Sequence, residues 1–221
     1  MPTDPTPKPI VLGITGASGT PLGLALLREL LALDRPVELI LTEKCIQVMQ
    51  EESGFKPGAN DGDRPARLCA FLGLEGDKAA LLRCYPNHDI GARPASGTHR
   101  TQGMAVVPCS MGTLAKIACG ISDNLTTRSA DVALKEGRPL VLVPRESPFN
   151  AIHLENMLKL SRLGVRIVPP VLAFYSREFL TMDGQIRYTV GKVLDQLGVE
   201  HDLFRPWSGM GHNQRLGPPE E

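Results

Sequence analysis

Short, nearly continuous apolar runs recur along this chain, and helical patterns separate most of them. A run of this kind suits a strand covered on both faces of a sheet, because successive side chains point to opposite faces. Strands that alternate with helices predict a parallel, doubly wound sheet with right-handed crossovers. We therefore expect an α/β fold with a single Rossmann-like (flavodoxin-like) domain. The expected strands are Ile10–Thr15, Val37–Leu41, Leu81–Tyr85, Met104–Pro108, Pro139–Val143 and Val165–Val168.

The segments between these strands carry helix signals. Asp123 is expected to cap a helix over 124–136. Ser147-Pro148 is expected to begin a helix that runs to about Arg162, with proline at the first helical position. The glycine- and proline-rich stretch 54–67 predicts a surface excursion. Further helices are expected over 20–33, 43–51, 64–73, 111–119 and 184–197.

Composition sets the outer boundaries of the folded part. Residues 1–9 alternate proline with small polar residues, which predicts a disordered lead-in. Neither a linker nor an internal repeat divides the remainder of the chain. We expect one domain over 10–205 and a tail over 206–221.

Charge and cysteine content exclude several classes of protein. Lysine plus arginine number 24, as do aspartate plus glutamate, which argues against general nucleic-acid affinity. The chain lacks a signal-peptide pattern and any run long enough to span a membrane, so the expected compartment is the cytoplasm. Five cysteines without a CxxC motif suit free thiols in a reducing compartment. The five histidines show no metal-ligand spacing, and we expect no metal.

Ligands of doubly wound sheets bind at the carboxyl ends of the strands, where the strand order reverses. The first candidate segment there is Gly13-Ile-Thr-Gly-Ala-Ser-Gly19. Its glycines let the backbone approach an anion, the next helix offers N–H groups, and Thr15 and Ser18 add hydroxyl donors. The spacing GxxGxxG is neither the dinucleotide fingerprint nor a Walker A loop. Nucleotide or phosphate binding is favoured, and a plain tight turn is the alternative.

Other candidates follow later strands. Ser110 and Thr113 stand where a strand gives way to a helix, and Ser110 could equally be only a cap of that helix. Arg128 and Lys135 are seven residues apart, so they share a helix face, which is more often a solvated surface. Arg145-Glu146 then places another cation and an acid at the ligand-binding edge, a set that suits a phosphate.

Taken together, these motifs resemble the UbiX family of flavin prenyltransferases. The similarity covers roughly residues 10–205, and six or more motifs occur in the family's order. The most specific words are PCSMGTLAKIACGISDNLTTRSADVALKEGRPLVLVPRESP and PPVLAFY. The matching stretches are Gly13–Gly19, Ala95–Thr98 with Gly103-Met104, Pro108–Glu146, Pro169–Tyr175 and Val193–Leu197.

The resemblance implies a metal-independent enzyme that joins the dimethylallyl group of dimethylallyl monophosphate to N5 and C6 of reduced FMN. It implies a homo-oligomer, a dodecamer in the family, whose active sites are shared between subunits. The product, prenylated FMN, would serve a partner UbiD-type decarboxylase. The implied FMN contacts are Gly16, Ala17, Ser18, Thr42, Ser110, Met111, Gly112, Thr113 and Arg145. The implied phosphate contacts are Arg128, Lys135, Tyr175 and Lys192.

The resemblance also assigns catalytic roles. Glu52 follows Thr42 by ten positions, as the family's catalytic glutamate follows its hydroxyl residue, and the adjacent Glu51 is the rival. Glu52 and Ser18 would manage protons around N5, Lys135 would oppose charge on the leaving phosphate, and Glu146 would assist later proton removal. Three departures from the family pattern are Thr42 for serine, Gly112 for lysine and Lys192 for arginine.

Three other functions remain as alternatives. An FMN-dependent decarboxylase of the cysteine-decarboxylase class shares the fold, but this chain has no equivalent of that class's Pro-x-Met-Asn segment. A non-catalytic FMN carrier is the second alternative. NAD-dependent oxidoreduction is disfavoured because GxGxxG and the following ribose-binding acid are both missing.

Overall fold

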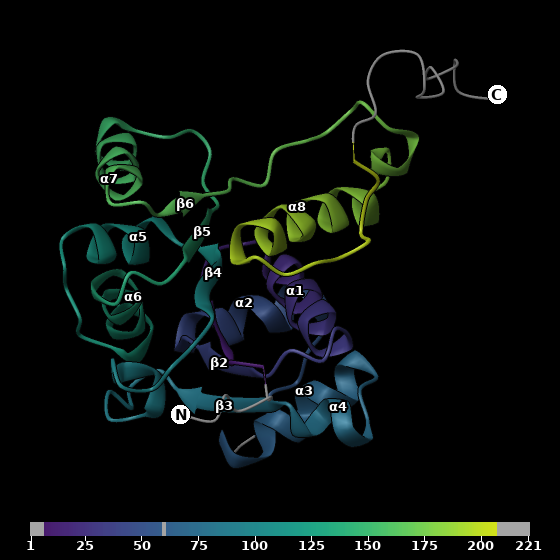
Figure 1. The fold of residues 1–221 in the computed structure, drawn as a ribbon. Coiled ribbons are helices and arrows are strands. Elements are labelled where there is room, and N and C mark those ends of the chain that lie inside the picture. The colour runs from purple at the N-terminus through teal and green to yellow at the C-terminus, as the bar shows by residue number, and fades with distance from the viewer. Residues whose placement is uncertain (1–6, 59–60, 207–221) are drawn as a thin grey trace.

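Six parallel strands form the single sheet of the computed structural model, which describes residues 7–58 and 61–206 (Figure 1). The strand order is β3-β2-β1-β4-β5-β6, which reverses direction between β1 and β4. This order is that of doubly wound nucleotide-binding sheets, so the predicted fold class is confirmed. The strands are β1 (Ile10–Ile14), β2 (Val37–Leu41), β3 (Leu82–Pro86), β4 (Gly103–Cys109), β5 (Leu140–Pro144) and β6 (Arg166–Ile167).

Helices cover both faces of this sheet. On one face, side chains of α1, α2, α3 and α8 form a core with Ile10, Leu12 and Ile14 of β1. On the other face, α5, α6 and α7 pack over Val11 and the strand residues that point the same way. The helices are α1 (Thr20–Ala32), α2 (Glu43–Ser53), α3 (Arg64–Leu72), α4 (Gly76–Ala80), α5 (Met111–Ala118), α6 (Leu125–Lys135), α7 (Ala151–Arg162) and α8 (Met182–Leu197). Three short 3-10 turns accompany them: η1 (Asp61–Asp63), η2 (Arg93–Ala95) and η3 (Arg177–Phe179).

Burial on both faces explains the unbroken apolar runs. Every residue of β1, β2, β4 and β5 is buried, and side chains alternate between the two cores. The one charged residue in these four strands is Glu38 of β2, which is 3% exposed. Its carboxylate accepts hydrogen bonds from Tyr85 Oη at 3.2 Å and lies 3.0 Å from His99 Nε2. A charged residue inside a strand is tolerated here because partners satisfy it.

Two helix starts differ from the predictions. The N-cap of α6 is Asn124 rather than Asp123, since the Asn124 side chain accepts the N–H of Thr127 in a reciprocal capping box. The helix predicted from Ser147-Pro148 begins at Ala151, because Asn150 forms the same kind of box with His153. Helix α4 was not predicted, and α3 occupies the end of the stretch expected to be a surface excursion.

Some expectations fall outside the described residues. Of the predicted lead-in, residues 1–6 lie outside, and of the predicted tail, so do 207–221. In the part of the chain that is described, no helix is long and apolar enough to cross a membrane.

Helix α1 lies unusually close to the sheet. A Cβ atom placed on Gly23 would lie 2.3 Å from the carbonyl oxygen of Val107 and 2.9 Å from Ile14 Cδ1. Neither neighbour can move freely, because both belong to buried strands. Glycine at this position therefore lets the helix approach, and so sets where its N-terminus lies above the strand ends.

We predict that Gly23→Ala lowers the free energy of unfolding by about 2–3 kcal/mol, since overpacking outweighs the better helix propensity of alanine. Urea denaturation followed by circular dichroism would measure the change. Gly112→Ala is the matched helical control, because its Cβ would meet no atom within 4 Å. Equal stability of both variants would contradict this account of α1 packing.

Candidate functional site

The candidate site lies at the carboxyl ends of β1, β2, β4 and β5, on both sides of the point where strand order reverses. Strands β1 and β4 are tied together at this edge by one hydroxyl group. Thr15 Oγ1 donates to the carbonyl of Pro108 at 2.8 Å and accepts the N–H of Ser110 at 2.8 Å. Thr15 is 1% exposed, so its expected role as a donor to a ligand is wrong. It fixes the two loops that surround the site.

The loop after β4 forms the start of α5. Ser110 is the N-cap, and its Oγ accepts the N–H of Thr113 at 3.3 Å. Met111 is mostly buried, whereas Gly112 is exposed and faces open space. The first N–H groups of a helix lack intrahelical partners, so this open first turn can receive a carbonyl or phosphate oxygen. Ser110 thus caps the helix, and this role leaves the rest of the turn accessible.

Helix α1 receives a carboxylate at its N-terminus. Glu52, near the end of α2, accepts the N–H of Gly19 at 3.0 Å and the N–H of Thr20 at 2.8 Å. Thr20 Oγ1 also donates to Glu52 Oε2 at 2.7 Å. Gly19 adopts a left-handed conformation, with φ 104°, and contributes no side-chain cap. The N–H groups that were expected to attract a ligand anion are bonded here to the protein's own carboxylate.

The hydrogen bonds around Glu52 determine its charge state. Partial burial alone would raise the pKa of this carboxyl group. Hydrogen bonds from the side chains of Ser18 and Thr20, and from the N–H groups of Gly19 and Thr20, outweigh burial and hold the pKa below its ordinary value of 4.5. Its neighbour Glu51 takes no part in these bonds. Of the two candidate acids, Glu52 is the one in contact with the loop after β1.

Two further candidates reach the same loop. Arg145 follows β5, and its Nε donates to the carbonyl of Ser18 at 3.0 Å. Thr42 caps α2, and its backbone N–H donates to the carbonyl of Ile14 at 3.1 Å. A Cβ on Gly16 would lie 2.5 Å from Lys44 Cβ, so α2 packs directly on this loop. The structure therefore brings together the loops that carry Gly16, Ala17, Ser18, Thr42, Ser110, Met111, Gly112, Thr113 and Arg145.

The four predicted phosphate ligands form two pairs of residues in different parts of the structure. The first pair is Arg128 and Lys135, and the second is Tyr175 and Lys192. Arg128 and Lys135 lie on α6, where Arg128 pairs with Asp131 at 2.8 Å and Lys135 pairs with Glu136. Lys192 lies on α8, where it pairs with Asp195 at 2.7 Å. Helices α6 and α8 pack on opposite faces of the sheet (Figure 1). Within one chain, the structure does not bring the two pairs together.

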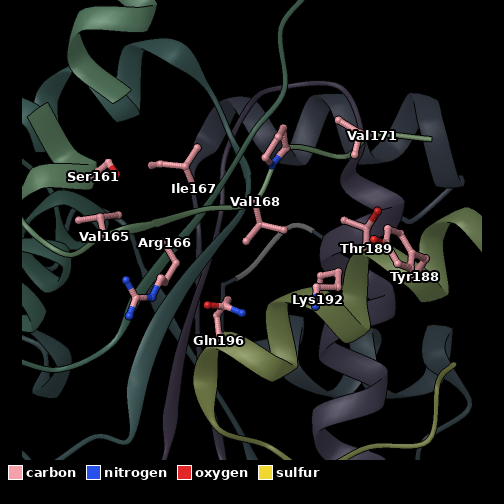
Figure 2. A pocket seen from close by; sticks show the side chains of 11 residues that line it. Ser161, Val165, Arg166, Ile167, Val168, Val171, Tyr188, Thr189, Lys192 and Gln196 are labelled. Carbon is pink, nitrogen blue, oxygen red and sulfur yellow. The ribbon is translucent and has the colours of Figure 1, made fainter. Parts of the chain in front are cut away.

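Tyr175 belongs to the α8 side. Its side chain is 44% exposed, and its ring packs edge-on against Phe179 at 5.2 Å and Tyr188 at 6.0 Å. Partial burial and the hydrogen bond with Tyr188 raise the pKa of Tyr175, so it remains a hydroxyl donor. Figure 2 shows the neighbouring pocket of about 410 Å³, which Tyr188 and Lys192 line from α8 and Arg166 from β6.

The described residues near this edge do not provide an activated cysteine nucleophile or a cluster of metal ligands. Cys109 is fully buried, and burial raises the pKa of its thiol to about 12, so it is not an activated nucleophile. Glu146 lies beside Arg145 in sequence, and its carboxylate accepts the N–H of Ser147 at 3.0 Å. Among residues 7–58 and 61–206, no group of three histidine, cysteine, aspartate or glutamate side chains could hold a metal ion.

One contributor to the site was not predicted. Thr20 is 0% exposed and gives two donors to the Glu52 carboxylate. Its partner is 32 residues away in sequence, so no local pattern could reveal the contact. The only available signal was its position directly after the glycine-rich loop.

A parallel sheet with this loop, hydroxyl, carboxylate and guanidinium set at its switch point defines a nucleotide-binding α/β protein, and residues 2–184 match the Flavoprotein family. Within that class, the chain belongs to the UbiX flavin prenyltransferase family. It is 47% identical over 200 residues to flavin prenyltransferase UbiX of Alkalihalophilus pseudofirmus, covering 90% of this chain and 96% of the relative. The corresponding protein of Pseudomonas aeruginosa is 42% identical over 201 residues, covering 91% and 94%.

Solved structures show the same likeness. A dodecameric FMN-dependent UbiX-like decarboxylase from Escherichia coli O157:H7 superposes with a TM-score of 0.78 at 41% identity, covering 90% of this chain and 99% of that one. AnUbiX in complex with FMN and dimethylallyl pyrophosphate gives a TM-score of 0.79 at 36% identity, covering 92% and 98%. A PPC decarboxylase, at 16% identity and a TM-score of 0.56, shares the fold alone.

We predict that Glu52→Gln destabilises the chain by about 0.5 kcal/mol near neutral pH, because the amide keeps an acceptor oxygen but loses the charge at the N-terminus of α1. The pKa of Glu52 is lower in the folded chain than its ordinary 4.5. The stabilisation from the carboxylate is therefore complete above pH 4.5 and is lost as the pH falls through the folded-state pKa. Urea denaturation over this pH range should show the difference from wild type shrinking on acidification. If Glu51→Gln showed the same pH-dependent loss of stability, the stabilisation would not be specific to Glu52 and the assignment would be wrong.

Proposed function

We propose that this chain transfers the dimethylallyl group of dimethylallyl monophosphate to reduced FMN and releases prenylated FMN. The observation that carries the proposal is the ionised Glu52 carboxylate, hydrogen-bonded to the loop after β1 at the sheet's switch point. Membership of the UbiX family and the likeness to AnUbiX, solved with FMN and dimethylallyl pyrophosphate, support the same chemistry.

The residues at this edge fit a flavin mononucleotide. Backbone N–H groups at the open first turn of α5 and the Arg145 guanidinium can receive its anionic and carbonyl oxygens. We propose that FMN is held by the loops after four strands, with Ser18, Thr42, Ser110 and Thr113 as hydroxyl partners. The remaining proposed contacts are Gly16, Ala17, Met111, Gly112 and Arg145.

Reduced FMN, when bound, supplies the two nucleophilic atoms, N5 and C6, that receive C1 and C3 of the allyl group. The phosphate leaves with the electrons of its C–O bond, so its negative charge grows as the bond breaks. We propose that Arg128, Lys135 and Lys192, with the Tyr175 hydroxyl, oppose this charge. One well-positioned donor of this kind lowers the activation free energy by about 3 kcal/mol.

We propose that the acidic residues at the strand ends carry out proton transfer. The Glu52 carboxylate is held ionised, so it can accept the proton of N5, with Ser18 as a relay. Glu146, on the loop after β5, is proposed to take the C6 proton in the later ring closure, in which C3 bonds to C6 and the alkene carbon C2 gains a proton. These roles need the hydrogen-bonded geometry of Glu52 and no metal ion.

Separation of the cations onto two faces supports a site completed by a neighbouring subunit. Arg128 and Lys135 would come from one chain, and Tyr175 and Lys192 from another. Several exposed apolar side chains on α7 and the segment before α8 are consistent with burial against other copies: Ile152, Leu158, Val171, Leu172 and Phe174. We propose a homo-oligomer, and a dodecamer by likeness to the structure from Escherichia coli O157:H7.

We further propose that a UbiD-type decarboxylase receives the product and that the protein works in the cytoplasm. All five cysteines are free, which suits a reducing compartment. A modified flavin that is released by one protein requires a second protein to use it.

The direct test incubates purified protein with reduced FMN and dimethylallyl monophosphate under anaerobic conditions. Mass spectrometry should find a flavin heavier by one C5H8 unit. Lys135→Ala and Glu52→Ala should bind FMN but lose the product, because one loses leaving-group stabilisation and the other the base. FMN that is bound and recovered unchanged by the wild type would favour a carrier, and full turnover by both variants would refute the site.

Mixed oligomers test whether subunits share the site. Lys135→Ala and Lys192→Ala should each be inactive alone. Co-expression in equal amounts should restore about a quarter of wild-type prenylation, because random assembly leaves that share of interfacial sites intact. If each site lay within one chain, mixing would restore nothing. Size-exclusion chromatography with light scattering would verify that both variants assemble normally.

A further inference from the structure

The N-terminus of α1 is closed by a residue from another helix. Gly19 has no side chain to cap the helix, and Glu52 accepts the N–H groups of Gly19 and Thr20 at the start of the helix. The Gly19 N–H is shared between both carboxylate oxygens, each at 3.0 Å. The backbone donors therefore hold the carboxylate at the start of α1, with the Thr20 N–H on Oε2 only.

The side chain of Thr20 reinforces the hold on one of these oxygens. Both Thr20 donors reach the same oxygen: the N–H lies 2.8 Å and Oγ1 lies 2.7 Å from Glu52 Oε2. Hydrogen bonds to an ionised acceptor are about twice as strong as neutral ones. Thr20 is 0% exposed, so water cannot replace the carboxylate as partner of its hydroxyl. The hydroxyl is consequently committed to Glu52.

We propose that Thr20 is a positioning residue: its hydroxyl holds Glu52 Oε2 against the first turn of α1 and so leaves Oε1 for proton transfer. The role in proton transfer rests on the proposed function. The fixed, ionised carboxylate does not, since it follows from the hydrogen bonds alone. Thr20 acts through Glu52 and needs no contact with flavin or prenyl donor.

The elements that pack around Glu52 also carry charged side chains. Lys44 and Glu51 come from α2 itself, and Arg145 comes from the loop after β5, where it reaches the Ser18 carbonyl. The side chain of Ser18 also donates to Glu52. These groups stay unchanged when Thr20 is substituted. A difference between Thr20 variants therefore reports the hydroxyl and not the wider electrostatic field.

The chain offers a closely matched control. Thr126 is also buried in the first turn of a helix, and its N–H and Oγ1 both donate to one oxygen, Asn87 Oδ1, at 3.2 and 2.7 Å. The acceptor there is a neutral amide. Thr126→Val therefore removes the same kind of buried hydrogen bond without touching Glu52, and separates lost stability from lost positioning.

The experiment compares wild type, Thr20→Val, Thr20→Ser and Thr126→Val in two measurements on the full-length protein. Isotope-edited infrared titration follows protonation of Glu52, assigned by the carboxyl band that disappears in Glu52→Gln. The pH profile of prenylated FMN formation follows the rate. Thr20→Val should protonate Glu52 at higher pH, move the acid limb of the rate profile the same way and lose about tenfold in kcat. Thr20→Ser should restore both, and Thr126→Val should move neither.

Wild-type titration of Glu52 in Thr20→Val would overturn the proposal, as would an equal displacement in Thr126→Val. A displaced titration with an unmoved rate profile would overturn the role in proton transfer. If wild type forms no prenylated flavin yet the infrared midpoint still moves in Thr20→Val, the proposed function fails while the fixed, ionised carboxylate stands.

Discussion

The hydrogen bonds between Glu52 and the first turn of α1 hold the functional edge of this protein together. They join the end of α2 to the loop after β1, and Arg145 reaches the same loop from β5. The hydroxyl of Thr15 adds the link to β4. Loops that are remote in sequence are thereby fixed by buried or charge-assisted hydrogen bonds and not by packing alone. A rigid frame of this kind can present backbone donors to a ligand at constant spacing.

The fold was largely predictable because its strands are buried on both faces. Runs such as those of β1 and β4 are apolar throughout, so neither periodicity nor turn chemistry had to be resolved to find them. Helix starts were harder. Asp123 and Asn124 can both cap a helix, and the choice depends on which side chain meets the Thr127 N–H. Sequence supplies the candidates, whereas backbone geometry selects one.

The sequence supplied candidate residues for the site more readily than their arrangement. The glycine-rich loop, Ser110 and Arg145 follow strands, so parallel topology alone brings them to one edge. Choosing Glu52 over Glu51 required the register of α2, and Thr20 emerged only from a contact across 32 residues. The placement of Lys135 and Lys192 over opposite faces depends on which side of the sheet each crossover helix packs. Patterns of charge do not encode that choice.

Division of the basic residues between two faces has a consequence for the subunit before it assembles. A newly synthesised subunit, folded but alone, carries only half of the proposed charge set at each of its surfaces. If the site is shared between subunits as proposed, this single subunit can bind flavin before it can ionise an allylic phosphate. Under that proposal assembly is the licensing step, because prenyl transfer begins only once neighbouring subunits complete the charge set.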